Sequence, residues 1–337
     1  MEVRRTARRV GGLIGHPARV VPGVRRRLRP RPPKPAPQPS RFDIITGPLN
    51  LSGHGLEIGA SWRPLLPKAK GYDVRVADHL DQAALVAKYD GMRPTDAIEP
   101  VDYVLTGRGL TGTIDERFDW IIASHVLEHT VCLVTFLRDA ETLLRPGGIL
   151  SLAVPDRRYC FDRFRDRSSL ARVIDVFRAA PALHSEGSVL EFYLGVVAKG
   201  ESISWDATHT GAFHQLHTLE EAREKAAIAT GEYVDVHNWV FTPNHLRLML
   251  VDLRTLGFIG LGEVAFHETV GSEFYIALSP DGPGPRLSRV ELVRLAALEV
   301  QGTEEIQFEA PRVNNDAAPS PAGRGDVAAD RTAGRVG

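Results

Sequence analysis

The sequence predicts an α/β fold built on a doubly wound, mostly parallel sheet, and three observations lead to this prediction. Short apolar runs alternate with helical patterns through the middle of the 337-residue chain. Residues 118–123 read FDWIIA, a continuous apolar run typical of a parallel strand that is buried on both faces. Glycine and proline punctuate the boundaries between these segments. Strands that alternate with helices imply βαβ units.

Seven segments have the character of strands. In order along the chain they are residues 55–59, 72–78, 101–105, 118–123, 149–154, 263–266 and 274–279. A helix with apolar residues at helical spacing precedes the fifth strand and ends at Pro146-Gly147-Gly148. Another helix begins at Thr242, an N-cap residue followed by proline, and ends before Gly257. Residues 155–240 contain histidines and aromatic residues but no clear strand, which predicts a helical insertion after strand five.

The two ends of the chain differ from this middle part, which we assign as one domain over residues 41–285. Residues 1–40 form a basic tail rich in proline and arginine, which predicts disorder. A further hypothesis is that residues 1–34 contact an anionic membrane. Residues 286–302 predict a short helix, opened by the capping box Ser288-x-x-Glu291, and residues 303–337 predict a second disordered tail.

Bulk composition narrows the function classes. The formal net charge is -1, so no nucleic-acid partner is expected. No run approaches the roughly 18 apolar residues of a membrane span, and the basic start lacks an apolar signal region. The two cysteines form no metal-binding pair. We therefore expect a cytoplasmic protein, peripheral to the inner membrane face if the tail binds lipid. The sequence carries no signal for an oligomeric state.

A ligand site is expected where the strands end, because open α/β sheets bind ligands beyond the carboxyl ends of their strands. The first predicted strand ends at Gly59, and the second ends at Asp78, about 19 positions later, which suits an acid that binds a ribose. The turn after Gly59 lacks the further glycines that seat a pyrophosphate. A cofactor without phosphates, such as S-adenosylmethionine, fits better. The alternative is a turn glycine and an exposed loop aspartate.

Two longer motifs bring in a family resemblance. Residues 118–129, FDWIIASHVLEH, look like the FD-x-V-x-x-x-x-V-L-E-H segment of class I S-adenosylmethionine-dependent methyltransferases of the type 11-like kind. Residues 143–150, LLRPGGIL, resemble the L-x-P-G-G turn into their fifth strand. The resemblance covers residues 50–160 and is weaker to 280. It implies a Rossmann-like, seven-stranded sheet and S-adenosylmethionine as cofactor. Residues 235–243, DVHNWVFTP, resemble bacterial methyltransferases associated with surface polysaccharides.

The resemblance also implies roles for individual residues. The methionine part of the cofactor is expected at Glu57, Gly59, Ala60 and Ser61. The ribose is expected at Asp78, with the adenosine beside His79 and Leu80 and its adenine near Thr106 and Gly107. Ser124 is expected beside the methionine and the substrate mouth. The chain departs from the family pattern in lacking G-x-G in the first motif and in having Thr106 where an acid is usual.

His125, Glu128 and His129 form the most reactive-looking cluster, just past the fourth strand. Three interpretations remain open. Glu128 and His129 cap the next helix and hold the loop, or His129 or His125 acts as general base, or the array binds a divalent metal. Small-RNA and quinone-precursor methyltransferases carry a similar Glu-x-x-Glu-His array that binds magnesium, but here His125 replaces the first acid. We assign His129 and His125 as catalytic residues and assign no metal ligand.

A second group of ionisable residues follows in the insertion. His209, His214 and His217, with His237 further on, do not match a standard zinc pattern. They are surface or core histidines, or they line the acceptor pocket. The segment Asp156-Arg157-Arg158 either faces the acceptor or only turns the chain.

These observations predict O-methylation of a sugar, a glycan or another small-molecule acceptor by direct displacement. The rival hypothesis is a non-catalytic, methyltransferase-like scaffold module of a glycan-assembly system, whose working part is the basic tail.

Overall fold

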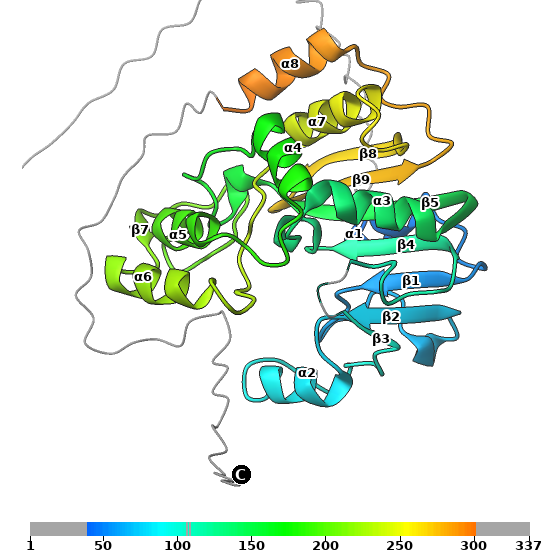
Figure 1. Cartoon of the computed structure of the whole chain (residues 1–337), viewed down its shortest axis with the longest axis horizontal. Helices are drawn as coiled ribbons and strands as arrows, with labels where there is room; N and C mark the ends of the chain where they lie inside the picture. Colours follow the sequence, from blue (N-terminus) through cyan, green and yellow to red (C-terminus); the bar gives the residue numbers. More distant parts are fainter. Residues whose placement is uncertain (1–38, 106, 108, 301–337) are drawn as a thin grey trace, which may run out of the picture. The chain divides into compact units, whose positions relative to one another are not determined.

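The computed structural model describes residues 39–105, 107 and 109–300, which contain a seven-stranded sheet in the order β3-β2-β1-β4-β5-β9-β8 (Figure 1). The strands are β1 (Gly55–Ile58), β2 (Val74–Asp78), β3 (Tyr103–Val104), β4 (Phe118–Ser124), β5 (Leu144–Pro155), β8 (Gly262–Val270) and β9 (Glu273–Ser279). The first five pair in parallel, and β9 pairs antiparallel with both β5 and β8. The predicted Rossmann-like, mostly parallel sheet is confirmed.

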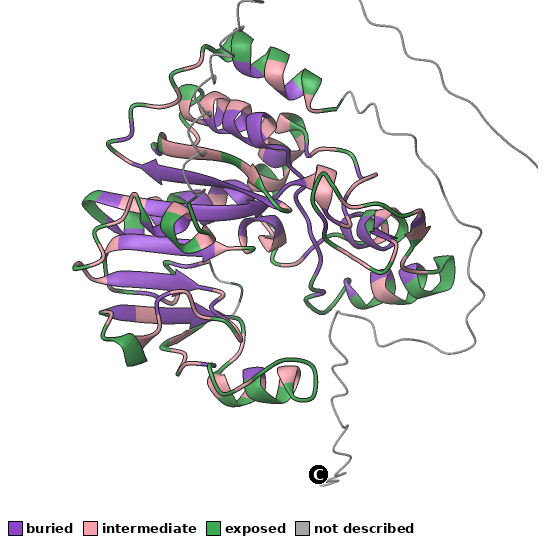
Figure 2. Cartoon of the chain, turned by 180° about the vertical axis from the view of Figure 1, so that it is seen from behind, coloured by how far each residue is buried: buried purple, intermediate pink, exposed green. Residues whose placement is uncertain are grey.

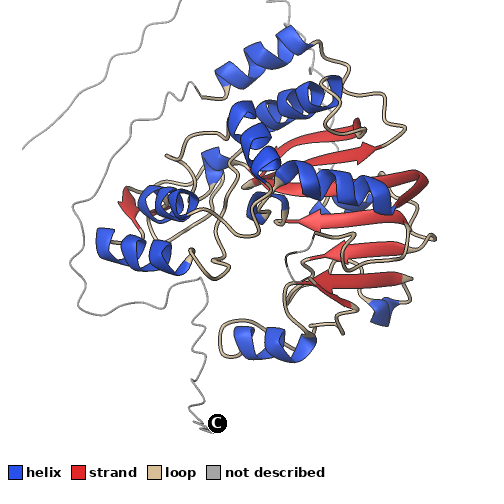
Figure 3. Cartoon of the chain, viewed as in Figure 1, coloured by secondary structure: helices blue, strands red, loops and turns tan. Residues whose placement is uncertain are grey.

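Helices cover both faces of this sheet (Figure 3). Those packed directly against it are α1 (Arg41–Thr46), α3 (Leu133–Leu143) and α7 (Pro243–Thr255), while α2 (Gln82–Tyr89) follows β2. Because successive side chains of a strand point to opposite faces, Ile121 of β4 packs in the cluster that contains Leu137 of α3. Trp120 and Ile122 pack in the other cluster, with Ile45 of α1. Strands β1, β4 and β9 are buried on both faces (Figure 2), as the apolar run in β4 predicted, whereas the edge strands β3 and β8 are partly exposed.

The segment between β5 and α7 forms the predicted helical insertion. It contains α4 (Leu170–Ala179), α5 (Glu186–Gly195), β6 (Val197–Lys199), β7 (Phe213–Gln215) and α6 (Leu219–Ile228). Val189, Phe192 and Ala222 belong to an apolar cluster of its own. The expectation that it holds no strand is wrong, because β6 and β7 pair antiparallel. Strands of three residues are too short to leave an alternating pattern in the sequence.

Several boundaries follow the predicted local signals, and two differ. Helix α8 (Arg289–Leu298) begins at the predicted capping box of Ser288 and Glu291. Strand β5 begins at Leu144, before the Pro-Gly-Gly turn, and therefore includes it. Thr242 stands at the N-cap of α7, but its side chain makes no capping hydrogen bond.

No helix within residues 39–105, 107 and 109–300 is long and apolar enough to cross a membrane. The predicted tails fall almost wholly on residues 1–38 and 301–337, which lie outside the described residues, as does Thr106. The predicted lipid contact of residues 1–34 therefore stays a prediction.

Candidate active site

The turn after β1 is shaped by Gly59. Its φ is +69°, a left-handed conformation that side chains disfavour, and a Cβ atom there would lie 2.7 Å from Cγ2 of Val126. The close approach brings the β1 turn against the loop that follows β4. The family resemblance predicts that the methionine part of the cofactor lies at Gly59. The atom that a side chain at this position would meet, however, belongs to Val126 of the protein.

Glu57 holds the loop that continues from this turn. Its buried carboxylate accepts hydrogen bonds from the backbone N–H groups of Leu65 at 2.7 Å and Leu66 at 3.0 Å. Burial raises the pKa of Glu57, and these two hydrogen bonds offset part of that effect. The side chain therefore shapes the loop around the expected cofactor position.

Asp78 joins the ends of β1 and β2. It is only 2% exposed, and its Oδ2 accepts a hydrogen bond of 3.1 Å from the backbone N–H of Ser61. Its Oδ1 lies 2.8 Å from the backbone nitrogen of His79 and 2.6 Å from Nδ1 of the same residue. A carboxylate oxygen can accept more than one hydrogen bond, so Asp78 retains capacity for a ribose hydroxyl. The hydroxyl of Ser61 is buried and has no hydrogen-bond partner among the described residues.

Other expected cofactor residues surround this turn. Ala60 is buried, Leu80 is half-buried and Gly107 is exposed with a φ of +82°. Ser124 ends β4, and its Oγ accepts a hydrogen bond of 2.5 Å from Nη2 of Arg41. Arg41 of α1 was not predicted for the site, because nothing in the local sequence shows that α1 reaches this edge of the sheet.

His125 lies directly after β4, with a φ of +54°. Its Nε2 is 2.6 Å from Oε2 of Glu273, and its Nδ1 is 3.5 Å from Oε1 of Glu128. Burial by itself lowers the pKa of His125, but the carboxylates of Glu128 and Glu273 outweigh it and raise the pKa to about 10. Glu273, also bound to Arg41, has its pKa lowered to about 2 despite burial. The two carboxylates thus favour the imidazolium form of His125, which has no lone pair, and this disfavours the base role, which stays a prediction.

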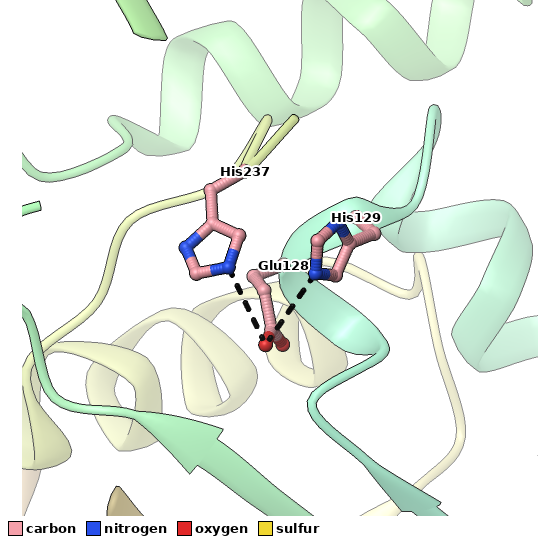
Figure 4. A group of neighbouring side chains, drawn as sticks. All are labelled: Glu128, His129 and His237. Carbon is pink, nitrogen blue, oxygen red and sulfur yellow. Dashed lines mark ion pairs between the residues drawn. The ribbon is translucent and has the colours of Figure 1, made fainter. Parts of the chain in front are cut away.

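Glu128 lies at the centre of the cluster and is 1% exposed. Neither carboxylate oxygen has a hydrogen-bond partner of good geometry in residues 39–105, 107 and 109–300. Its Oε1 lies 3.9 Å from Nε2 of His237 and 4.0 Å from Nε2 of His129 (Figure 4). Despite burial, the pKa of Glu128 is lowered, because His125 and His237 favour the ionised form. The capping part of the structural interpretation is wrong, since the N-cap of α3 is Cys132 and makes no side-chain capping bond, whereas the part in which these residues hold the loop stays a prediction.

Both histidines beside Glu128 are oriented by a second carboxylate. Nδ1 of His129 is 2.9 Å from Oδ1 of Asp235, and Nδ1 of His237 is 2.5 Å from Oδ2 of Asp162. Burial lowers the pKa of His129, but the Asp235 carboxylate more than offsets this, so the pKa is raised overall. Each imidazole therefore presents its Nε2 atom to Glu128.

Within the described residues, no hydrogen bond or ion pair joins this cluster to His209, His214 or His217. Nε2 of His209 lies 3.1 Å from the backbone oxygen of Lys199, His217 packs against Tyr193, and His214 lies in β7. His237 alone of the group reaches Glu128 within the described part of the chain, and the DVHNWVFTP segment was the signal that could have singled it out.

In the segment after β5, the contacts of Asp156 are with other residues of the protein. Asp156 is fully buried, pairs with Arg158 at 2.5 Å and accepts a hydrogen bond of 2.6 Å from Thr269. This acid ties the end of β5 to β8 and has little capacity left for an acceptor.

Comparison with known proteins identifies the domain. Residues 67–152 match the family described as a methyltransferase domain. The chain is 27% identical, over 52% of its length, to the ubiquinone biosynthesis O-methyltransferase of Methylobacterium sp. (strain 4-46), of which it covers 75%. It is 31% identical, over 38% of its length, to the enzyme of that name from Methylobacterium nodulans, of which it spans less than half (45%). It is also similar to the solved structure of the CcbJ methyltransferase from Streptomyces caelestis, with 13% identity, coverage of 72% and 96%, and a TM-score of 0.37.

The chain carries a class I methyltransferase domain that uses S-adenosylmethionine. The residues present fit that cofactor in this methyltransferase. Asp78 is buried with capacity to accept from a ribose, and the hydroxyl of Ser61, unpaired among the described residues, lies in the same turn. These features lie at the point where the strand order reverses, between β1 and β4.

Proposed function

We propose that this methyltransferase transfers its methyl group to a hydroxyl oxygen of a small-molecule or glycan acceptor. The observation that carries the proposal is the buried carboxylate of Glu128 next to the end of β4. Its oxygens have no hydrogen-bond partner within the described residues, and histidine nitrogens flank it at 3.5–4.0 Å. A hydroxyl acceptor brings an O–H donor and must lose its proton during transfer. The carboxylate and imidazole groups of the cluster can accept the hydrogen bond of the hydroxyl and can then accept its proton.

The two sides of the site have different tasks in this proposal. S-adenosylmethionine supplies a methyl group already activated on a sulfonium, so the protein mainly has to align the reacting atoms. Gly59, Ser61 and Asp78 hold the cofactor at the ends of β1 and β2. Glu128 and His129, at the end of β4, orient the acceptor hydroxyl and receive its proton.

Two further similarities support the acceptor class. Both curated relatives are named as O-methyltransferases, which favours oxygen as the methylated atom. Residues 235–243 resemble methyltransferases of surface-polysaccharide systems, which favours a sugar, and this segment supplies His237 to the cluster.

The test uses the purified full chain with S-adenosylmethionine that carries a deuterated methyl group. Nucleotide sugars, oligosaccharides, dihydroxy aromatic compounds and amines are offered as acceptors. We expect a labelled methyl ether on a hydroxyl, detected by mass spectrometry and placed by NMR. His129→Ala should abolish most of the product, whereas Arg223→Ala, an exposed residue of α6, should leave turnover unchanged. Labelled N-methyl or C-methyl products in place of the ether would overturn the proposal.

A further inference from the structure

Three potential ligand atoms converge at the end of β4. A carboxylate oxygen of Glu128 and one ring nitrogen each of His129 and His237 all lie within 4.8 Å of one another (Figure 4). We propose that these three side chains bind a divalent transition-metal ion, of the class of Zn²⁺, Mn²⁺, Fe²⁺ or Co²⁺. The ion would face the acceptor. With the ion bound, Glu128 and His129 would be its ligands, and the acceptor hydroxyl would lose its proton at the ion. This inference therefore rests on the proposed function, but metal binding can be measured without an acceptor.

The burial of Glu128 is the first argument. Glu128 is an ionised carboxylate that is 1% exposed, and neither oxygen has a hydrogen-bond partner in the described part of the chain. Its ion pairs there, with His125, His129 and His237, are long, at 3.5–4.0 Å. A closer ligand such as a metal ion would offset the cost of burying this charge. The distances of 3.9 and 4.0 Å from Glu128 to the two Nε2 atoms are too long for hydrogen bonds. They suit ligands that share one ion, because bonds of about 2.1 Å place ligand atoms roughly 3–4 Å apart.

The outer contacts of the two histidines are an independent argument. Metal-binding histidines usually donate their second ring N–H to a carboxylate, which fixes the tautomer and turns the other nitrogen toward the ion. Asp162 occupies that place behind His237 with a hydrogen bond, whereas Asp235 lies 2.9 Å from Nδ1 of His129 as an ion pair without hydrogen-bond geometry. Asp162 is itself held by Arg165 at 2.6 Å. Each of the two histidines, which come from distant parts of the chain, therefore has a carboxylate beside its Nδ1 atom.

The kinds of donor atom indicate the class of ion. Magnesium and calcium prefer sites made only of oxygen, whereas two imidazole nitrogens and one carboxylate suit transition metals. Three protein ligands leave at least one position for water or an acceptor hydroxyl. The sequence pattern predicts no metal ligand, because His125 replaces the first acid of the magnesium-binding array. In the structure His125 binds Glu273 through Nε2, and His237 supplies the third ligand.

Metal binding is tested on the untagged full chain, stripped with chelator and dialysed. We expect one equivalent of Zn²⁺ or Co²⁺ per chain by calorimetry, and Co²⁺ absorption bands of a site with nitrogen and oxygen ligands. His237→Gln and Glu128→Gln should remove both signals. Asp162→Asn should weaken affinity about 10–100-fold, the usual effect of losing an outer carboxylate. His267→Gln, on the exposed part of β8, is the matched histidine control and should bind as the wild type does.

Two results would overturn the proposal. One is the absence of stoichiometric binding by the folded wild-type chain, which would leave ion pairs with the neighbouring histidines as the account of the cluster. The other is a site that persists unchanged in folded Glu128→Gln and His237→Gln proteins, because the metal then lies elsewhere. If circular dichroism shows that a variant does not fold, the stoichiometry and the Co²⁺ spectrum of the wild-type chain still decide whether it has a metal site. A chain that binds the ion but forms no methyl ether contradicts only the proposed function.

Discussion

The two halves of the site are built in different ways. The cofactor half, made of the turn after β1 and the end of β2, relies on backbone N–H groups and on residues that are close in sequence, such as Ser61 and Asp78. The acceptor half joins the loop after β4 to the last segment of the insertion, through Glu128 and His237. In the cofactor half the carboxylates are hydrogen-bonded within the protein. In the acceptor half Glu128 has no such bond to any described residue.

This difference indicates which half has carboxylate oxygens that are free to bind another group. Satisfied carboxylates hold a fixed shape, which suits the binding of one constant cofactor. An unsatisfied buried carboxylate needs another partner, which suits an acceptor, a proton or an ion. The backbone of the insertion is anchored to the same residue, since the backbone oxygen of Glu128 accepts hydrogen bonds from the N–H groups of Asn238 and Trp239. The insertion therefore completes the acceptor half.

The largest effect is expected for the acceptor half. His129→Ala should lower the methyl-transfer rate by about 10²–10⁴-fold, the usual range for a lost proton-transfer group. Affinity for the cofactor should stay nearly unchanged, because His129 contacts Asp235 and faces Glu128. Steady-state kinetics and calorimetry with S-adenosylhomocysteine check the two parts. A folded His129→Ala protein that turns over normally would show that the cluster is structural.

The opposite pattern is expected in the cofactor half. Asp78→Ala should weaken cofactor binding by about 1.5–3 kcal/mol, the scale of lost hydrogen bonds to a charged group. It also removes the bond to Ser61 that joins the two strand ends. Calorimetry measures the affinity, and Asp78→Asn, which keeps one acceptor oxygen, should lose less. Unchanged affinity in Asp78→Ala would remove this residue from the cofactor half.

Gly59→Ala tests the contact between the halves. A left-handed conformation costs a residue with a side chain about 1–2 kcal/mol, and here the added methyl group also meets Val126. We expect the free energy of unfolding to fall by at least that amount, measured by chemical denaturation. The double variant Gly59→Ala/Val126→Ala gives room for the methyl group but keeps the backbone strain. A Gly59→Ala protein as stable as the wild type would mean that the turn is not held as described.

The smallest effect is expected outside both halves, at Glu116. Hydrogen bonds from Tyr103, and then from Arg75 and His54, lower the pKa of Glu116 to about 2 despite partial burial. A carboxylate whose pKa is lowered on folding stabilises the fold above its ordinary value of about 4.5, and this is lost as the pH falls toward 2.

Glu116→Gln should therefore destabilise the fold at pH 7, by no more than about 1 kcal/mol because the group is partly exposed. The difference from wild type should shrink between pH 5 and pH 3.5 in denaturation experiments. Methyl transfer at pH 7 should not change. A difference that grows on acidification would contradict the lowered pKa.

Local signals in the sequence determined most of the fold. The apolar run of β4, the glycine after β1 and the capping box of α8 each depend on residues within one turn or strand. Burial, backbone conformation and capping act over such short distances, so they leave a pattern in the sequence. The same reason explains why the sequence alone was enough to select Gly59 and Asp78 as candidates.

Only the tertiary structure decided the acceptor half. Arg41, Asp162, Asp235 and Glu273 were not expected there, and His237 was grouped with histidines that lie elsewhere. The pKa of His125 depends on Glu273, which follows in the chain only after the whole insertion. Electrostatic interactions act through space, so ionisable groups affect each other once folding has brought them together. No spacing along the chain encodes that convergence, and the chemistry of Glu128 and its histidines follows from it.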